Sequence, residues 1–301
     1  MADIAELRHR IKSIQDTHQI TKAMELISVA KMRKAVVKQS FSSVYFDSVR
    51  YTLKDIMRHS NDIHNRYTEH RPDNRTAYIV IAGDKGLAGS FNNNVLNLAW
   101  EHMQKRPVHY VVTIGQMARA FFESREQQVD LEFTHAVTNP TLHDARGVMR
   151  DILELYDRNL MDEVYVVFTR MKSASVYEPE LVKLLPIEEK DIEADVTSTY
   201  TGEICYDPSP KEVLDVLVPQ YLVGMIYSTL IHSSASEHAA RMMAMSNANK
   251  NAEKMLDALN LEYNRLRQSA ITTELLDLSS GRFFSENNLH QKVKHSNGKT
   301  R

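Results

Sequence analysis

The sequence has few residues that interrupt helices, and they are unevenly distributed. Only nine of the 301 residues are glycine and eight are proline. The first proline is Pro72, the first glycine is Gly83, and no proline follows Pro219. After Gly224 the next glycine is Gly281. Because glycine and proline punctuate turns, this distribution predicts an unbroken helix at each end of the chain and a punctuated middle.

The sequence also has only one cysteine and a net charge close to zero. The single Cys205 excludes an internal disulfide framework and a cysteine-rich metal site. The net charge of -2 leaves no overall basic excess for binding nucleic acid. The start of the sequence lacks the basic and apolar regions of a signal peptide, and no run approaches the roughly 20 apolar residues of a transmembrane helix. We therefore expect membrane association only through partners, and no nucleic-acid partner.

Helix-end signals delimit the two predicted terminal helices, which we call the first and second arms. Asp3 with Glu6 forms a capping-box pattern at the start of the first arm. The run Ser209–Glu212 supplies an N-cap serine, a proline at the first helical position and a glutamate at the third. Gly281 stands where a helix commonly ends. The predicted domains are a helix over 1–59, an α/β domain over 75–205, a helix over 209–281 and a basic, disordered tail over 282–301.

The middle of the chain alternates between apolar, β-branched runs and helical patterns. Such alternation, with strands that are apolar throughout, is typical of a mostly parallel sheet covered on both faces. An edge strand is expected over 180–185. The other predicted strands are 77–82, 108–114 and 164–169, and the predicted helices are 94–105, 116–124 and 141–161.

One arm leads into the predicted domain and the other leaves it, so the two must run antiparallel if they pack together. The predicted fold class is therefore α/β: a long antiparallel two-helix coiled coil formed by the N- and C-terminal helices, plus a Rossmann-like globular domain. The heptad seam is uneven, because it passes through His18, Thr21, Glu25 and Ser28. A two-helix rod with so little core is expected to need a surrounding partner.

The sequence motifs give little support for a catalytic, nucleotide-binding or metal-binding site. Gly83–Ser90 lies between a strand and a helix, where glycine loops hold phosphate, but it matches neither common nucleotide-binding pattern. Glycines that ease a tight turn are the favoured interpretation, and a nucleotide-binding α/β enzyme with helical extensions stays open as the alternative. The 13 histidines show no metal-ligand spacing, and no nucleophile elbow is present. We expect no catalytic, cofactor-binding or metal-binding residue.

Several motifs together resemble a known family. The N-terminal runs Ile20–Glu25 and Ala30–Ala35 strongly resemble the first helix of F-type ATP synthase gamma subunits. The second arm agrees through Ala235–Met242 and Tyr263–Leu275. The turn Asp84–Asn92 and the run Tyr206–Pro210 are also similar to that family. The resemblance extends from about residue 4 to Gly281.

The resemblance implies a function for the whole chain. Gamma subunits form the central-stalk rotor shaft, which transmits torque between the membrane c-ring and the catalytic alpha/beta hexamer during ATP synthesis or hydrolysis. The implied partners are the alpha and beta subunits, the epsilon subunit and the c-ring. The resemblance implies that the chain is not itself an enzyme. It also implies a peripheral location at the cytoplasmic face of a bacterial plasma membrane. There the complex would couple ATP synthesis to the transport of protons or other ions.

The resemblance also implies residue roles. Thr272 and Glu274 would tie the two helices together at the tip of the shaft, and Tyr206 and Asp207 would lie in the foot near the c-ring and epsilon. A basic run on a helix is more often a solvated face, but here it would meet acidic loops of the beta subunits. The implied contacts with beta are Met24, Lys22, Lys31, Arg33, Arg241, Arg267 and Gln268.

Overall fold

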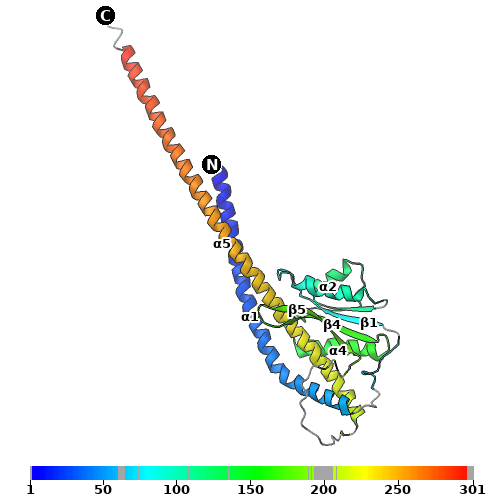
Figure 1. Ribbon diagram of the computed structural model, residues 1–301. Helices are drawn as coiled ribbons and strands as arrows, with labels where there is room; N and C mark the ends of the chain where they lie inside the picture. The colour runs from blue at the N-terminus through cyan, green and yellow to red at the C-terminus, as the bar shows by residue number, and fades with distance from the viewer. Residues whose placement is uncertain are drawn as a thin grey trace. The chain divides into compact units, whose positions relative to one another are not determined.

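The computed structural model describes residues 2–59, 65–72, 75–106, 109–134, 136–188, 190, 192, 206–207 and 209–296. Contacts divide the chain into two compact units. One unit combines the residues up to Ala23 with those from Ser246 onward, and the other runs from Met24 to Met245. The helices are α1 (Ala2–His59), α2 (Phe91–Met103), α3 (Gln116–Glu123), α4 (Leu142–Asp157) and α5 (Pro210–Ser296) (Figure 1).

The larger unit contains one five-stranded sheet in the order β3-β2-β1-β4-β5. The first four strands in this order are parallel, and β5 pairs antiparallel with β4. This order is that of a Rossmann half with an added edge strand, as the alternating pattern predicts. The strands are β1 (Thr76–Ile81), β2 (His109–Ile114), β3 (Leu131–Phe133), β4 (Glu163–Met171) and β5 (Tyr177–Leu185).

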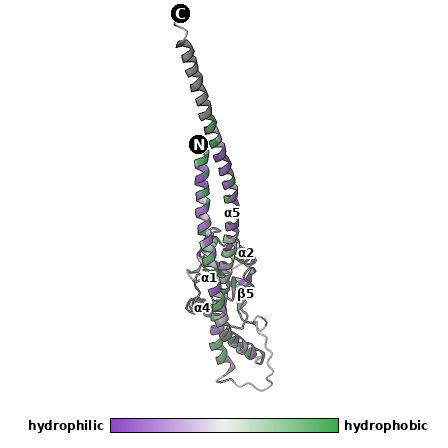
Figure 2. Cartoon of the chain, turned by 90° about the vertical axis from the view of Figure 1, so that its left-hand side faces the viewer, coloured by the Kyte–Doolittle hydropathy of each residue, from purple (hydrophilic) through white to green (hydrophobic). Residues whose placement is uncertain are grey.

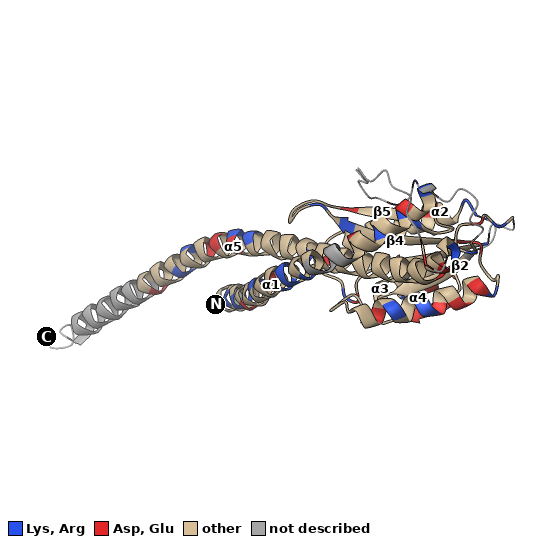
Figure 3. Ribbon diagram, turned by 90° about the horizontal axis from the view of Figure 1, so that it is seen from below, with Lys and Arg blue, Asp and Glu red and all other residues tan. Residues whose placement is uncertain are grey.

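Helices cover both faces of the sheet. Successive residues of a strand point to opposite faces, so Tyr78 and Val80 pack with α2 and α3, whereas Ile79 and Ile81 pack with α4 and with parts of α1 and α5. The four side chains are fully buried. In Figure 3 the outer face of α4 carries interspersed red and blue bands, as expected where a helix meets solvent. The prediction of a sheet covered on both faces is confirmed.

The crossing of α1 and α5 in this unit depends on one glycine. The ring of Phe46 on α1 lies directly against Gly224 on α5: a methyl group at Gly224 would come within 2.1 Å of a Phe46 ring carbon. The ring also meets Tyr227, with the two ring centroids 6.2 Å apart. Gly224 thus allows the two helices to approach closely.

The start of α5 has the predicted cap. The backbone N–H of Glu212 donates to Ser209 Oγ at 3.3 Å, and that hydroxyl donates to the Glu212 carboxylate at 3.4 Å. Among the described residues, α5 is the one helix that is long and apolar enough to cross a membrane, and 50% of its most apolar 18-residue window is buried in the fold. The expectation that no stretch is apolar enough to cross a membrane is therefore wrong. Apolar side chains of α5, among them Leu222 and Ile226, belong to a core against the sheet.

The smaller unit is an antiparallel pair of helical segments. Leu7, Ile11 and Ile14 of α1 are buried or half-buried, as are Leu256 and Leu259 of α5. Most of the remaining side chains are exposed, and Figure 2 shows the N-terminal segment of α1 coloured mainly as hydrophilic. The seam is therefore narrow, and the pair has little core per residue.

The C-terminal end of α5 differs from the prediction. The helix continues through Gly281 to Ser296, so 282–296 does not form the expected disordered tail, and 297–301 lies outside the described residues. Glycine within a helix costs only about 1 kcal/mol relative to alanine. No proline follows Gly281 in the sequence, so nothing obliges the helix to stop there.

Candidate functional site

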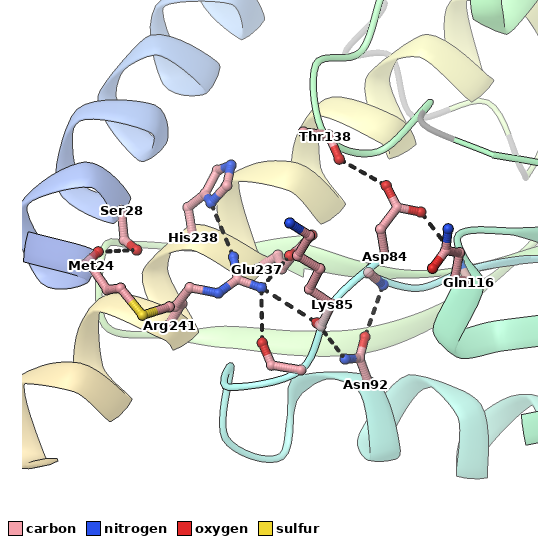
Figure 4. Close-up of polar contacts among 12 residues, drawn as sticks. Met24, Ser28, Asp84, Lys85, Asn92, Gln116, Thr138, Glu237, His238 and Arg241 are labelled. Atoms are coloured by element: carbon pink, nitrogen blue, oxygen red, sulfur yellow. Dashed lines mark hydrogen bonds and ion pairs between the residues drawn. The ribbon is translucent and has the colours of Figure 1, made fainter. Parts of the chain in front are cut away.

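A buried polar cluster of the larger unit joins α5 to the glycine turn that precedes α2. The guanidinium of Arg241 donates to the Glu237 carboxylate at 2.5 Å and to the backbone carbonyls of Gly86 at 3.2 Å and Lys85 at 3.4 Å (Figure 4). Its other terminal nitrogen lies 3.4 Å from His238 Nδ1. Arg241 therefore clamps the long helix to the domain. We call these residues the Arg241 clamp.

The glycine turn itself is shaped to receive the clamp. The N–H of Gly83 donates to Asn92 Oδ1 at 2.8 Å. A methyl group at Gly83 would lie 3.0 Å from the Glu237 carboxyl carbon and 3.2 Å from Asn92 Oδ1. Only a residue without a side chain leaves Glu237 this room. The structure thus confirms the favoured interpretation of Gly83–Ser90 as a tight turn, and it gives the turn's carbonyls a partner in Arg241.

The clamp also contains two titratable groups in unusual states. Glu237 is 6% exposed, and burial raises its pKa, although Arg241 opposes that shift. His238 is 5% exposed, and burial, together with Arg241 and Lys31, lowers the pKa of its imidazole to about 4. At neutral pH the ring is uncharged and accepts from Arg241 at Nδ1, so its proton resides on Nε2.

Directional bonds also join α5 to strand β4. The N–H of Thr169 donates to Ser233 Oγ at 3.4 Å, and Ser236 Oγ donates to the Thr169 carbonyl at 3.2 Å. Both serines are buried. The run of small residues Ser233–Ser236 in α5 therefore packs on the sheet, where short side chains let helix and strand approach closely.

The predicted contact residues of α1 lie mostly at its surface. Lys22, Lys31 and Arg33 are exposed, and Met24 is half-buried. Figure 4 shows Met24 on the side of α1 that faces Arg241, next to Ser28, whose hydroxyl donates to the Met24 carbonyl at 2.7 Å. Blue bands mark the basic residues along α1 in Figure 3. The exposed cations of α1 are accessible to a partner, whereas Met24 is half-buried on the side toward Arg241.

Arg241 differs from the other predicted contacts. Only 9% of it is exposed, and its guanidinium is engaged within the chain. The structure therefore gives Arg241 an internal role, while its predicted contact with a partner stays a prediction. The sequence carried a signal for this role, since a glutamate four residues before an arginine is a favourable helical ion pair.

Polar pairs hold the seam of the smaller unit. Arg8 donates to the Tyr263 hydroxyl at 2.8 Å, and His18 Nε2 lies 3.5 Å from the Glu253 carboxylate. In the same seam the Thr21 hydroxyl donates to Asn249 Oδ1. The hydrogen bond from Arg8 lowers the pKa of the Tyr263 hydroxyl. Two of the heptad positions that were poor for a coiled coil, His18 and Thr21, thus have polar partners on the other helix, which help to fix the register.

The predicted tie at the tip of the shaft, by Thr272 and Glu274, stays a prediction. Among the described side chains, Arg8 of α1 lies opposite Tyr263 of α5. The Thr272 hydroxyl donates to the Gln268 carbonyl of its own helix at 2.9 Å. Glu274 is exposed.

The remaining predicted residues are at accessible positions. Arg267 and Gln268 are exposed on α5, and Asp207 is exposed just before it. Tyr206 is half-buried, and its hydroxyl donates to Asp55 Oδ2 at 3.2 Å. Burial, followed by the influence of Asp55, raises the pKa of the Tyr206 hydroxyl. In the described part of the chain no group of three His, Cys, Asp or Glu side chains is placed to hold a metal ion.

Comparison with known proteins agrees with this architecture. A family model described as ATP synthase matches residues 3–282. An ATP synthase gamma chain of Ruminiclostridium cellulolyticum is 41% identical over 93% of this chain and 97% of the relative. A gamma chain of Acetobacterium woodii, named as sodium ion specific, is 33% identical over 93% of this chain and 97% of the relative.

Solved structures share the fold. The rotor of the Euglena gracilis mitochondrial ATP synthase aligns with a TM-score of 0.63 and 17% identity, over 90% of this chain and 99% of that one. The central stalk and c-ring structure from Tetrahymena thermophila aligns with a TM-score of 0.59 and 20% identity, over 76% and 99%.

The chain thus combines an antiparallel pair of helical segments with a Rossmann-like α/β domain to which α5 is bonded. The extent and identity of the matches make the assignment specific. The chain belongs to the ATP synthase gamma-chain family.

Proposed function

We propose that the chain is the central-stalk rotor subunit of an F-type ATP synthase. It transmits torque between the membrane c-ring and the catalytic alpha/beta hexamer during ATP synthesis or hydrolysis. The observation that carries this proposal is the 41% identity to an ATP synthase gamma chain over 93% of the chain. The fold supports it, because both long helices are anchored on one domain.

The surface of the helices suits the proposed contacts with beta subunits. Exposed cations on α1 are provided by Lys22, Lys31 and Arg33. Acidic loops of the beta subunits, the lever loops, would contact them. Met24 adds a flexible thioether, a side chain that adapts to changing partner surfaces. Arg267 and Gln268 are exposed on α5, as a contact with the beta catch loop requires.

The domain end of the chain is the proposed foot. Tyr206 and the exposed Asp207 precede α5 there, and they would lie near the epsilon subunit and the c-ring. The chain would then be peripheral at the cytoplasmic face of a bacterial plasma membrane, held by its partners. The burial of half of the apolar window of α5 supports attachment through partners.

A non-catalytic role is part of the proposal. The carbonyls of the glycine turn receive Arg241, so the turn serves the fold, and no metal-binding cluster is present in the described ranges. The isolated chain should therefore hydrolyse no ATP. The alternative, a nucleotide-binding enzyme, requires micromolar binding of ATP or NAD by the isolated chain, which equilibrium dialysis measures.

Direct observation of rotation tests the main proposal. Gln128 is exposed at the surface of the domain. A bead attached to Gln128→Cys, in a chain that also carries Cys205→Ser, should rotate in one direction when the chain is assembled with alpha and beta subunits and supplied with ATP. ATP hydrolysis by the assembled complex with a stationary bead would refute the rotor assignment. A complex assembled without the chain is the control for bead attachment.

A further inference from the structure

A lysine-lined pocket lies beside the Arg241 clamp. Its volume is about 170 Å³. Taking about 30 Å³ for a water in the liquid, this is room for roughly five heavy atoms, the number in an orthophosphate ion. The pocket is bounded by α1, by α5 and by the segment 138–140 that precedes α4.

Three cations of one helix face converge on this pocket. Lys31, Lys34 and Lys38 line it, and their spacing of three and four residues places them on the same side of α1. None of the described residues that line the pocket is acidic. Lys38 Nζ donates to neutral oxygens only, to Asn139 Oδ1 at 2.8 Å and to the Pro140 carbonyl at 3.1 Å. The positive charge of the pocket is thus not neutralised by its own walls.

A buried donor completes the wall on the α5 side. His238 lines the pocket although 95% of its surface is buried, since its exposed fraction is 5%. Its Nδ1 accepts from Arg241 at 3.4 Å, so the neutral ring carries its proton on Nε2. Figure 4 shows the second ring nitrogen of His238 on the side away from Arg241. The imidazole therefore links the Arg241 clamp to the pocket.

We propose that this pocket binds a tetrahedral oxyanion, inorganic phosphate being the expected ligand. Lys31 and Lys34 supply charge-assisted hydrogen bonds, and His238 Nε2–H supplies a buried, fixed donor. Lys38 already joins α1 to the segment 138–140, and the anion adds a connection from both to α5. A bound anion also favours the tautomer of His238 that accepts from Arg241, so occupancy stabilises the Arg241 clamp. This site goes beyond the rotor function and does not depend on it.

Equilibrium dialysis of radiolabelled inorganic phosphate against the full-length chain tests the proposal, with ionic strength held constant by KCl. The wild-type chain should bind one phosphate saturably. Lys34→Gln, at an exposed position of the pocket, should weaken binding about fivefold, the effect of losing one partly solvated charge-assisted bond. Lys254→Gln removes the same charge from an exposed position of α5 outside the pocket and should leave binding unchanged.

Hydrogen exchange provides a readout that is local to the site. Phosphate should slow amide exchange in peptides covering 136–142 and 231–240 of the wild-type chain and of Lys254→Gln, and less so in Lys34→Gln. Absence of saturable binding would overturn the proposal. So would equal weakening by both substitutions, because the lysines would then act as a diffuse basic surface, suited to the carboxylates of a partner protein.

Discussion

Removal of the Arg241 side-chain charge should weaken the attachment of α5 to the domain and so lower the stability of the larger unit. In Arg241→Met the aliphatic part of the side chain is kept, while the bonds to Glu237, Gly86 and Lys85 are lost. Glu237 is 6% exposed and would become a buried carboxylate that has lost its ion-pair partner, with Lys31 as the remaining cation that lowers its pKa. Breaking a buried ion pair in this way costs about 3–5 kcal/mol. We expect a loss of that size in the free energy of unfolding at pH 8.

The loss should depend on pH in a defined direction. The pKa of Glu237 is already raised by burial, and it rises further when Arg241 is absent. A carboxyl whose pKa is raised in the folded state penalises folding increasingly as pH rises above the unfolded value of about 4.3. At pH 5 the penalty should shrink to about 1–2 kcal/mol, the loss of hydrogen bonds to the turn. The double variant Arg241→Met/Glu237→Gln should lack the part of this pH dependence that comes from Glu237.

The single tryptophan reports this unfolding. Trp100 is half-buried on α2, with its ring centroid 6.3 Å from that of Phe122, so its fluorescence follows the larger unit in a urea titration. Arg267→Met is the matched control, because Arg267 is exposed and its loss should leave stability unchanged. Equal stability of Arg241→Met and wild type, or a penalty that is independent of pH, would refute the argument that Arg241 neutralises Glu237.

Three further substitutions test other parts of the structure. Gly224→Ala should destabilise the larger unit by about 1–3 kcal/mol in the same titration, because the added methyl overlaps the Phe46 ring; the loss should shrink when Phe46→Leu is added, and a more stable Gly224→Ala would contradict the packing. Met24→Lys places a further cation on the basic face of α1 and should lower ion pumping per ATP hydrolysed in vesicles, whereas an unchanged ratio would remove Met24 from the proposed contact. Truncation after Gly281 should leave ATP hydrolysis and complex stability unchanged, because the family match ends at residue 282; a change in either would assign the tail a role.

Much of the fold follows from local patterns. Three strands and the edge strand were marked by apolar, β-branched runs, and the long helices by the scarcity of glycine and proline. Strand β3 escaped, because Leu131–Phe133 is three residues long and only half-buried, and so carries no periodic signal. The continuation of α5 beyond Gly281 also escaped, since a glycine at a helix end and a tolerated helical glycine look alike in sequence.

The site was harder to anticipate because its bonds join distant parts of the chain. Arg241 and Gly86 are 155 positions apart, so no spacing rule connects them. The resemblance assigned Arg241 to a partner contact and did not indicate its bonds to the glycine turn. It likewise did not indicate the interhelical hydrogen bond between Arg8 and Tyr263. The pocket beside His238 could not be foreseen, since it requires three elements at once.

The anchorage of α5 on the domain has a mechanical consequence. A helix held only by apolar contacts can turn about its own axis, because dispersion forces have little angular preference. Ser233, Ser236 and Arg241 are spread over about 140° of the circumference of α5. Each makes directional bonds to a fixed backbone group. Advancing the helix by one residue turns each side chain by about 100°, which breaks all of these bonds together. Twist applied to this segment of α5 is therefore passed to the sheet without angular slip, and yielding must occur elsewhere along the helix.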